Sequence, residues 1–68
     1  MNEVDARGLS CPEPAMMAVQ ALRQWPNETF KVLVSSATSR DNVTNMARKR
    51  GRTVNTVRDG NDFILTIE

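Results

Sequence analysis

The only cysteine of the chain, Cys11, follows a Gly-Leu-Ser segment and precedes a region of helical periodicity. The thiolate is the reactive form of cysteine, and the unpaired N–H groups and dipole at a helix N-terminus stabilise it. Pro12 suits the first helical position because its fixed φ and missing N–H cost nothing there. The order of these residues therefore predicts a nucleophilic thiol mounted at the start of a helix.

The neighbours of Cys11 both support and oppose this prediction. Pro12 and Pro14 restrict the backbone and would hold the sulfur at a defined place. Glu13 suits the first turn of a helix, but its charge opposes ionisation of the thiol where the carboxylate points toward the sulfur. On composition alone, a free cysteine is more often a small buried hydrophobic residue. Residue type by itself therefore leaves both roles open.

Composition excludes several classes of function. The chain has no histidine, so Cys11 lacks the usual general base of a cysteine hydrolase and a zinc site cannot be assembled. A single cysteine cannot form an internal disulfide, which fits a reducing compartment. The first five residues include two acidic residues and no basic one, and no apolar run reaches membrane-spanning length. We expect a cytoplasmic protein without a cofactor, a metal or membrane contact.

A basic cluster formed by Arg48, Lys49, Arg50 and Arg52 is the second candidate feature. Basic residues in a last helical turn complement the helix dipole, which is a sufficient structural reason for them. They could also form a docking patch for an acidic protein face or for RNA phosphates. The net charge of +1 gives no field that would attract nucleic acid to the whole molecule, and no aromatic residues interleave with the cluster. Protein docking is preferred, and RNA binding remains the alternative.

Two helices are expected to position these features. The first begins at Pro12 and ends at Trp25, which should cover the core; we place Met16 in the core and Met17 outside. The second is expected to be capped by Thr38 and Ser39, with Asp41 completing a capping box, and to end at Gly51. The predicted apolar stripes are Ala15, Met16, Ala18, Val19 and Leu22 in the first helix and Val43, Met46 and Ala47 in the second.

Four strands complete the predicted architecture, over residues 3–6, 30–35, 53–57 and 63–67. The last two should form an antiparallel hairpin around a turn over residues 58–62. The order predicts an α+β fold: a two-layer β-α-β-α-β-β sandwich with a four-stranded mixed sheet and both helices on one face. The other sheet face should be solvated or covered by a partner. Without repeats or linkers, residues 1–68 are expected to form a single domain.

The segment Gly8-Leu9-Ser10-Cys11-Pro12-Glu13-Pro14 resembles the signature of the TusA/SirA-like family. The resemblance covers nearly the whole chain, through Asp5, Leu22, residues 32–34, Gly51, Gly60 and Phe63. It implies that Cys11 bears a persulfide, supported by Gly8, Leu9, Pro12, Glu13 and Pro14. It also implies a donor enzyme such as a cysteine desulfurase and a downstream acceptor protein, in sulfur or selenium metabolism or tRNA thiolation.

The chain departs from the family pattern at two places, Gln20 and Ser36-Ala37, where many relatives have a lysine and an Asp-Pro pair. Residues 11–17 and 41–43 are most similar to the YedF-like branch, which is associated with selenium metabolism. These features leave the donor and acceptor open. Three hypotheses follow: a sulfur carrier that is a monomer when free, an RNA-binding module, and a regulatory protein-interaction domain. The family resemblance favours the first.

Overall fold

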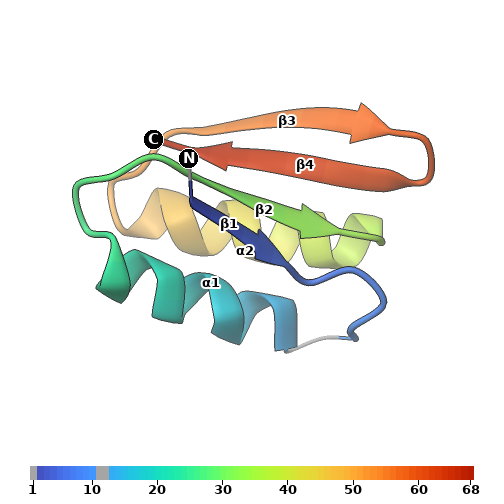
Figure 1. Ribbon diagram of the computed structural model, residues 1–68, viewed down its shortest axis with the longest axis horizontal. Helices are drawn as coiled ribbons and strands as arrows, with labels where there is room; N and C mark the ends of the chain where they lie inside the picture. The colour runs from blue at the N-terminus through green and yellow to red at the C-terminus, as the bar shows by residue number, and fades with distance from the viewer. Residues whose placement is uncertain (1, 11–12) are drawn as a thin grey trace.

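A computed structural model describes residues 2–10 and 13–68 of the chain. It contains β1 (Asn2–Asp5), α1 (Glu13–Gln24), β2 (Phe30–Val34), α2 (Ala37–Lys49), β3 (Val54–Asp59) and β4 (Asp62–Ile67). One layer is the sheet and the other contains both helices (Figure 1). The predicted β-α-β-α-β-β order and the two-layer α+β fold are confirmed.

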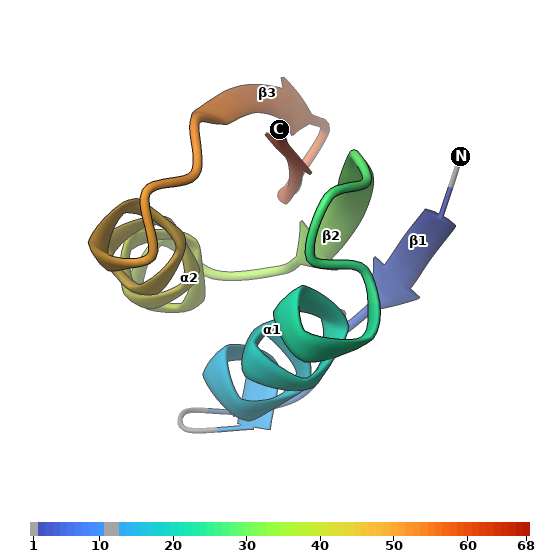
Figure 2. The same ribbon diagram turned by 90° about the vertical axis from the view of Figure 1, so that its left-hand side faces the viewer.

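The sheet is mixed, with strand order β1-β2-β4-β3. β1 pairs with β2 in parallel, and β4 pairs with both β2 and β3 in antiparallel orientation. Figure 2 shows both helices on the same face of this sheet. Because each helix follows one of the two parallel strands, α1 and α2 begin at the same end of the molecule (Figure 1). Gly8, in the loop after β1, therefore lies next to Ser35, which precedes α2.

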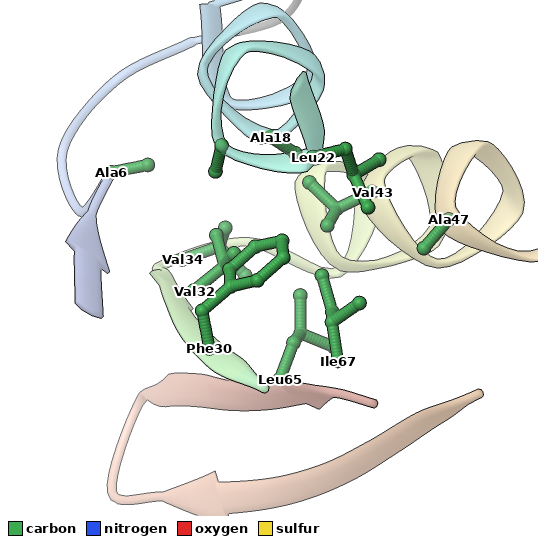
Figure 3. Packing of buried hydrophobic residues seen from close by; sticks show 11 residues of the cluster. Ala6, Ala18, Leu22, Phe30, Val32, Val34, Val43, Ala47, Leu65 and Ile67 are labelled. Atoms are coloured by element: carbon green, nitrogen blue, oxygen red, sulfur yellow. The ribbon is translucent and has the colours of Figure 1, made fainter. Parts of the chain in front are cut away.

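The core lies between the helices and the central strands. Alternate residues of β2 are buried, and the register places Phe30 opposite Ile67 and Val32 opposite Leu65. Figure 3 shows these side chains pointing toward the helices. Alanines on the helix side, Ala18 among them, let the helical backbone approach the sheet closely. The buried hydrophobic residues are Ala6, Ala18, Ala21, Leu22, Phe30, Val32, Val34, Val43, Ala47, Leu65 and Ile67.

The predicted phase of the first helix is wrong at the methionines. Met16 is 57% exposed, whereas Met17 packs against the core. The buried face of α1 is centred on Ala18. Met16 precedes Ala18 by two residues, so its side chain lies about 200° around the helix axis from that face. Met46 of α2 is half-buried and lies outside the core cluster. Trp25 packs against the core as expected, with its ring centroid 5.7 Å from that of Phe30.

The predicted start of the second helix is also wrong. Ser36 is the N-cap of α2, and its Oγ accepts a hydrogen bond from the Ser39 backbone N–H at 3.1 Å. Thr38 and Asp41 are exposed residues of the helix instead. The predicted end is confirmed: Gly51 follows the helix with φ of 76°, and the Arg52 N–H donates to the Ala47 carbonyl at 3.0 Å. This is a Schellman ending, which needs a residue with positive φ.

The hairpin has a shorter turn than predicted. Asp59 pairs with Asp62, so only Gly60 and Asn61 connect the strands. Gly60 has φ of 62°, which a glycine at the first position of a tight two-residue turn adopts without strain. Both strands therefore extend further toward the turn. The hairpin reaches the end of the molecule where both helices begin (Figure 1).

The sheet face away from the helices carries mixed residues. Lys31 lies opposite Thr66, and the neighbouring row joins Leu33 to Ile64 and Ile64 to Val57. Val57 is 58% exposed. This second face is therefore partly solvated, with one short apolar row across three strands. Within residues 2–10 and 13–68, no helix has the length and apolar character needed to cross a membrane.

Candidate functional site

The predicted nucleophile Cys11 and the predicted first helical residue Pro12 lie outside the described residues. The residues on either side define where the chain enters and leaves this position. The Glu13 N–H donates to the Ser10 carbonyl at 3.0 Å, and both residues are exposed. The chain is therefore exposed immediately before and immediately after the two residues that are not described.

Two apolar residues of the motif anchor the segment. Leu9, before Cys11, packs against the core, and Pro14, after it, is almost completely buried. Proline in the first turn costs no helical hydrogen bond. The core therefore holds the chain at Leu9 and at Pro14, on either side of the predicted nucleophile.

A backbone-to-side-chain contact ties this loop to the neighbouring one. Gly8, with φ of 79°, donates its N–H to the Ser35 Oγ at 2.9 Å. Ser35 follows β2, and the Ala6 N–H donates to the Leu33 carbonyl of β2 at 2.8 Å. The positive φ explains the glycine of the motif. The part played by Ser35 was missed from the sequence, because nothing in its local pattern indicates a contact with Gly8.

An ion pair braces the start of the loop. The Arg7 guanidinium donates to both carboxylate oxygens of Asp5, from Nε at 2.9 Å and from Nη2 at 2.8 Å. The Arg7 backbone N–H donates to Asp5 Oδ1 at 3.2 Å, and Arg7 Nη1 lies 3.9 Å from Asp62. These side-chain and backbone hydrogen bonds lower the pKa of Asp5 to about 2, and the carboxylate raises the pKa of Arg7. The sequence marked Asp5 through the family resemblance, but it gave no sign of the bidentate pair.

Asp5→Asn should reduce stability at neutral pH, with an effect that disappears in acid. The pKa of Asp5 is below its ordinary value of 3.8, so the folded state favours the ionised carboxylate. The resulting stability is present above about pH 4 and is lost as the pH falls toward about 2. Urea midpoints of the variant and the parent protein should therefore converge across this window. Asp59→Asn is the control, because Asp59 makes no ion pair among the described residues. A gap that persists unchanged at pH 2 would refute the assignment.

Three residues of the basic cluster are exposed at the end of α2: Arg48, Lys49 and Arg50. Within the described part of the chain, no ion pair engages them. Arg40, earlier in α2, differs because it pairs with Asp41 at 3.0 Å and its guanidinium lies 4.8 Å from the centroid of Phe63. The unpaired positive charge of α2 is therefore concentrated in its last turn and the residue that follows.

Arg52 has a different environment from the rest of the cluster. Its guanidinium lies 5.7 Å from the centroid of Phe30 and donates to four backbone carbonyls. The acceptors are Trp25 at 3.4 Å, Pro26 at 3.2 Å, Glu28 at 2.5 Å and Glu68 at 2.9 Å. These bonds join the loop after α1 to the end of β4. Arg52 is thus a structural brace, with most of its donors already engaged.

The two predicted features lie at opposite ends of the helical layer. Glu13 is at the first turn of α1, whereas Arg48 to Arg50 lie where α2 ends (Figure 1). A groove of about 520 Å³ lies at the junction of α1 and α2. Ala15 and Val19 line it from α1, and Met46, Lys49 and Arg50 are among the residues that line it from α2.

The fold and the sequence together define a small two-layer α+β domain whose single cysteine lies between β1 and α1 in the chain. The family model for the sulfurtransferase TusA matches residues 2–68, and the chain belongs to this family of sulfur carriers. A solved structure of a SirA-like protein from Desulfitobacterium hafniense is similar, with a TM-score of 0.90 and 31% sequence identity. The similarity covers 98% of this chain and 95% of that one. No curated protein matches the chain.

Proposed function

We propose that Cys11 is the sulfur-bearing residue of this TusA-family domain and that it carries sulfur as a persulfide. The Cys11 thiolate attacks the terminal sulfur of a donor persulfide, the donor S–S bond breaks, and the donor thiolate leaves. Delivery repeats this exchange, with an acceptor thiolate attacking the terminal sulfur of Cys11. Each step forms one S–S bond and breaks another, so no external oxidant or reductant is needed.

The anchoring of the motif on both sides of Cys11 carries this proposal. Leu9 and Pro14 are held by the core, while Ser10 and Glu13 between them are exposed. A carrier needs a mounted sulfur that partner enzymes can reach, and it needs no general base of its own. The absence of histidine from the chain, which argues against a self-sufficient cysteine hydrolase, is compatible with that requirement.

Incubation with a cysteine desulfurase and cysteine tests the proposal. Intact-protein mass spectrometry should show the mass of one added sulfur, and reductant should remove it. A protein that stays unmodified with several donor enzymes, although its thiol alkylates readily, would contradict the carrier role.

We further propose that the donor is a cysteine desulfurase and the acceptor a protein of sulfur or selenium metabolism or tRNA thiolation. The reducing conditions needed by a free thiol support a cytoplasmic location. Residues 1–68 would act as one domain that is monomeric when free. Arg48, Lys49 and Arg50 would contribute to docking, whereas the carbonyl contacts of Arg52 support a structural task instead.

Glu13→Gln should make Cys11 react faster with iodoacetamide at pH 7. Glu13 is exposed and stands two positions after Cys11, so its negative charge disfavours the thiolate. For charges on the order of 7 Å apart in water the interaction is about 0.6 kcal/mol, which corresponds to a two- to threefold change in rate. Glu28→Gln makes the same charge change in the loop before β2 and should leave the rate unaltered. Equal acceleration in both variants would show a general charge effect.

A further inference from the structure

The groove between α1 and α2 has chemically distinct parts. Its apolar surface comes from Ala15 and Val19 of α1 and Met46 of α2, while Lys49 and Arg50 lie at its C-terminal end. The volume of the groove is about 520 Å³. Figure 2 shows the two helices side by side beneath the sheet, so an occupant would contact both.

The charges of the groove select the chemistry of its occupant. None of its lining residues is acidic, and Lys49 and Arg50 make no ion pair within residues 2–10 and 13–68. The occupant should therefore supply carboxylates. The lining contains no aromatic residue on which a nucleotide base could stack, which favours a protein over single-stranded RNA.

The dimensions favour a helical occupant. The α2 side of the groove extends from Asn42 to Arg50, about 12 Å along the helix axis. This length corresponds to roughly two turns of a partner helix, which would bury apolar residues at i, i+3, i+4 and i+7 against Val19 and Met46. A third helix packed on two neighbouring helices covers the groove along its length.

The groove also begins close to the reactive segment. Ala15 lies four residues after Cys11, so the chain keeps their Cα atoms within about 14 Å. We propose that this groove is the docking site for an acidic amphipathic helix of a sulfur-relay partner, which brings the partner's sulfur-transferring group to Cys11. The role of the partner in the relay rests on the proposed function, whereas the groove and its charge stand independently.

The test measures binding of a defined probe to the full chain. The probe is a short fluorescent peptide with alanine and leucine on one helical face and glutamate on its flanks, and its control carries lysine at every glutamate. The acidic peptide should bind and the basic one should not. Lys49→Glu and Arg50→Glu should each weaken binding about three- to fivefold, because attraction of a surface pair becomes repulsion.

Arg48→Glu is the matched control, since it makes the same charge change in the same turn but lies outside the groove lining. It should weaken binding less than twofold. Ala15→Glu should block the apolar part of the groove and so weaken peptide binding. The helix should tolerate this change, because a negative charge is favourable in the first turn of α1. Equal effects at Arg48, Lys49 and Arg50, unchanged binding to Ala15→Glu, or tighter binding of a single-stranded RNA that depends on Lys49 and Arg50 would each overturn the proposal.

Sulfur loading of the same variants tests the carrier role separately from the docking site. At high desulfurase concentration, every groove variant should still acquire sulfur on Cys11, because each variant retains this residue. Loading without binding of the acidic peptide would refute the docking site alone. Peptide binding by a protein that never acquires sulfur would refute the carrier role and leave the groove assignment standing.

Discussion

Cys11→Ser is expected to abolish sulfur loading completely while leaving the protein folded. The chain has no second cysteine, so no other side chain can form a persulfide. Serine is among the best N-cap residues, and the apolar anchors Leu9 and Pro14 remain unchanged. Mass spectrometry after incubation with a desulfurase and cysteine should show no added sulfur, and the urea midpoint should stay close to that of the parent protein.

The stability measurement distinguishes the two roles that the sequence leaves open for this cysteine. A buried structural cysteine would resist replacement by a polar hydroxyl, since an unsatisfied buried group costs about 1–3 kcal/mol. Cys11→Ala provides the complementary control, because it removes the sulfur without adding a polar group. A serine variant that loses cooperative unfolding, next to an alanine variant that retains it, would support the structural role.

The fold was predictable because its signals are local and repeated. Alternation of Phe30, Val32 and Val34 indicated a strand with one buried face, and Gly51 and Gly60 marked a helix end and a turn. These residues act through backbone conformation and periodicity, which a sequence displays directly. The same signals predicted the order of the elements, which the structure confirms. The predicted family is confirmed by the family match.

The predictions from sequence were wrong where a local residue pattern fits two different structures. In those places a contact or a neighbouring element decides between the two structures, and the local pattern does not show it. Ser36, Thr38 and Ser39 are all acceptable N-cap residues. Which of them caps α2 depends on where the chain leaves β2 and enters the helix. The methionine assignment failed because the alanines on either side of Met16 and Met17 fit more than one helix phase. Arg52 looked like part of a surface cluster, yet its guanidinium binds carbonyls of segments far away in the sequence.

Phe30→Ala should nearly eliminate the folded state. Phe30 is fully buried in the central strand β2, opposite Ile67 (Figure 3). Its ring centroid lies 5.7 Å from that of Trp25, which follows α1. Truncation of a buried phenylalanine costs about 3–5 kcal/mol through lost burial and the remaining cavity. At roughly 0.05–0.15 kcal/mol per residue, a chain of 68 residues has about 3–10 kcal/mol of stability in total.

The loss of stability in Phe30→Ala should exceed the cost of the cavity alone, because Phe30 also supports the Arg52 brace. The Arg52 guanidinium lies against its ring and donates to carbonyls on both sides of it in sequence. Phe30→Leu keeps most of the volume and should retain cooperative unfolding in urea, with a smaller decrease in midpoint. Val57→Ala, at a residue that is 58% exposed, should change the midpoint little. If Phe30→Ala unfolds at nearly the same urea concentration as Val57→Ala, the buried ring is not the centre of the core and the packing between α1 and β2 is assigned wrongly.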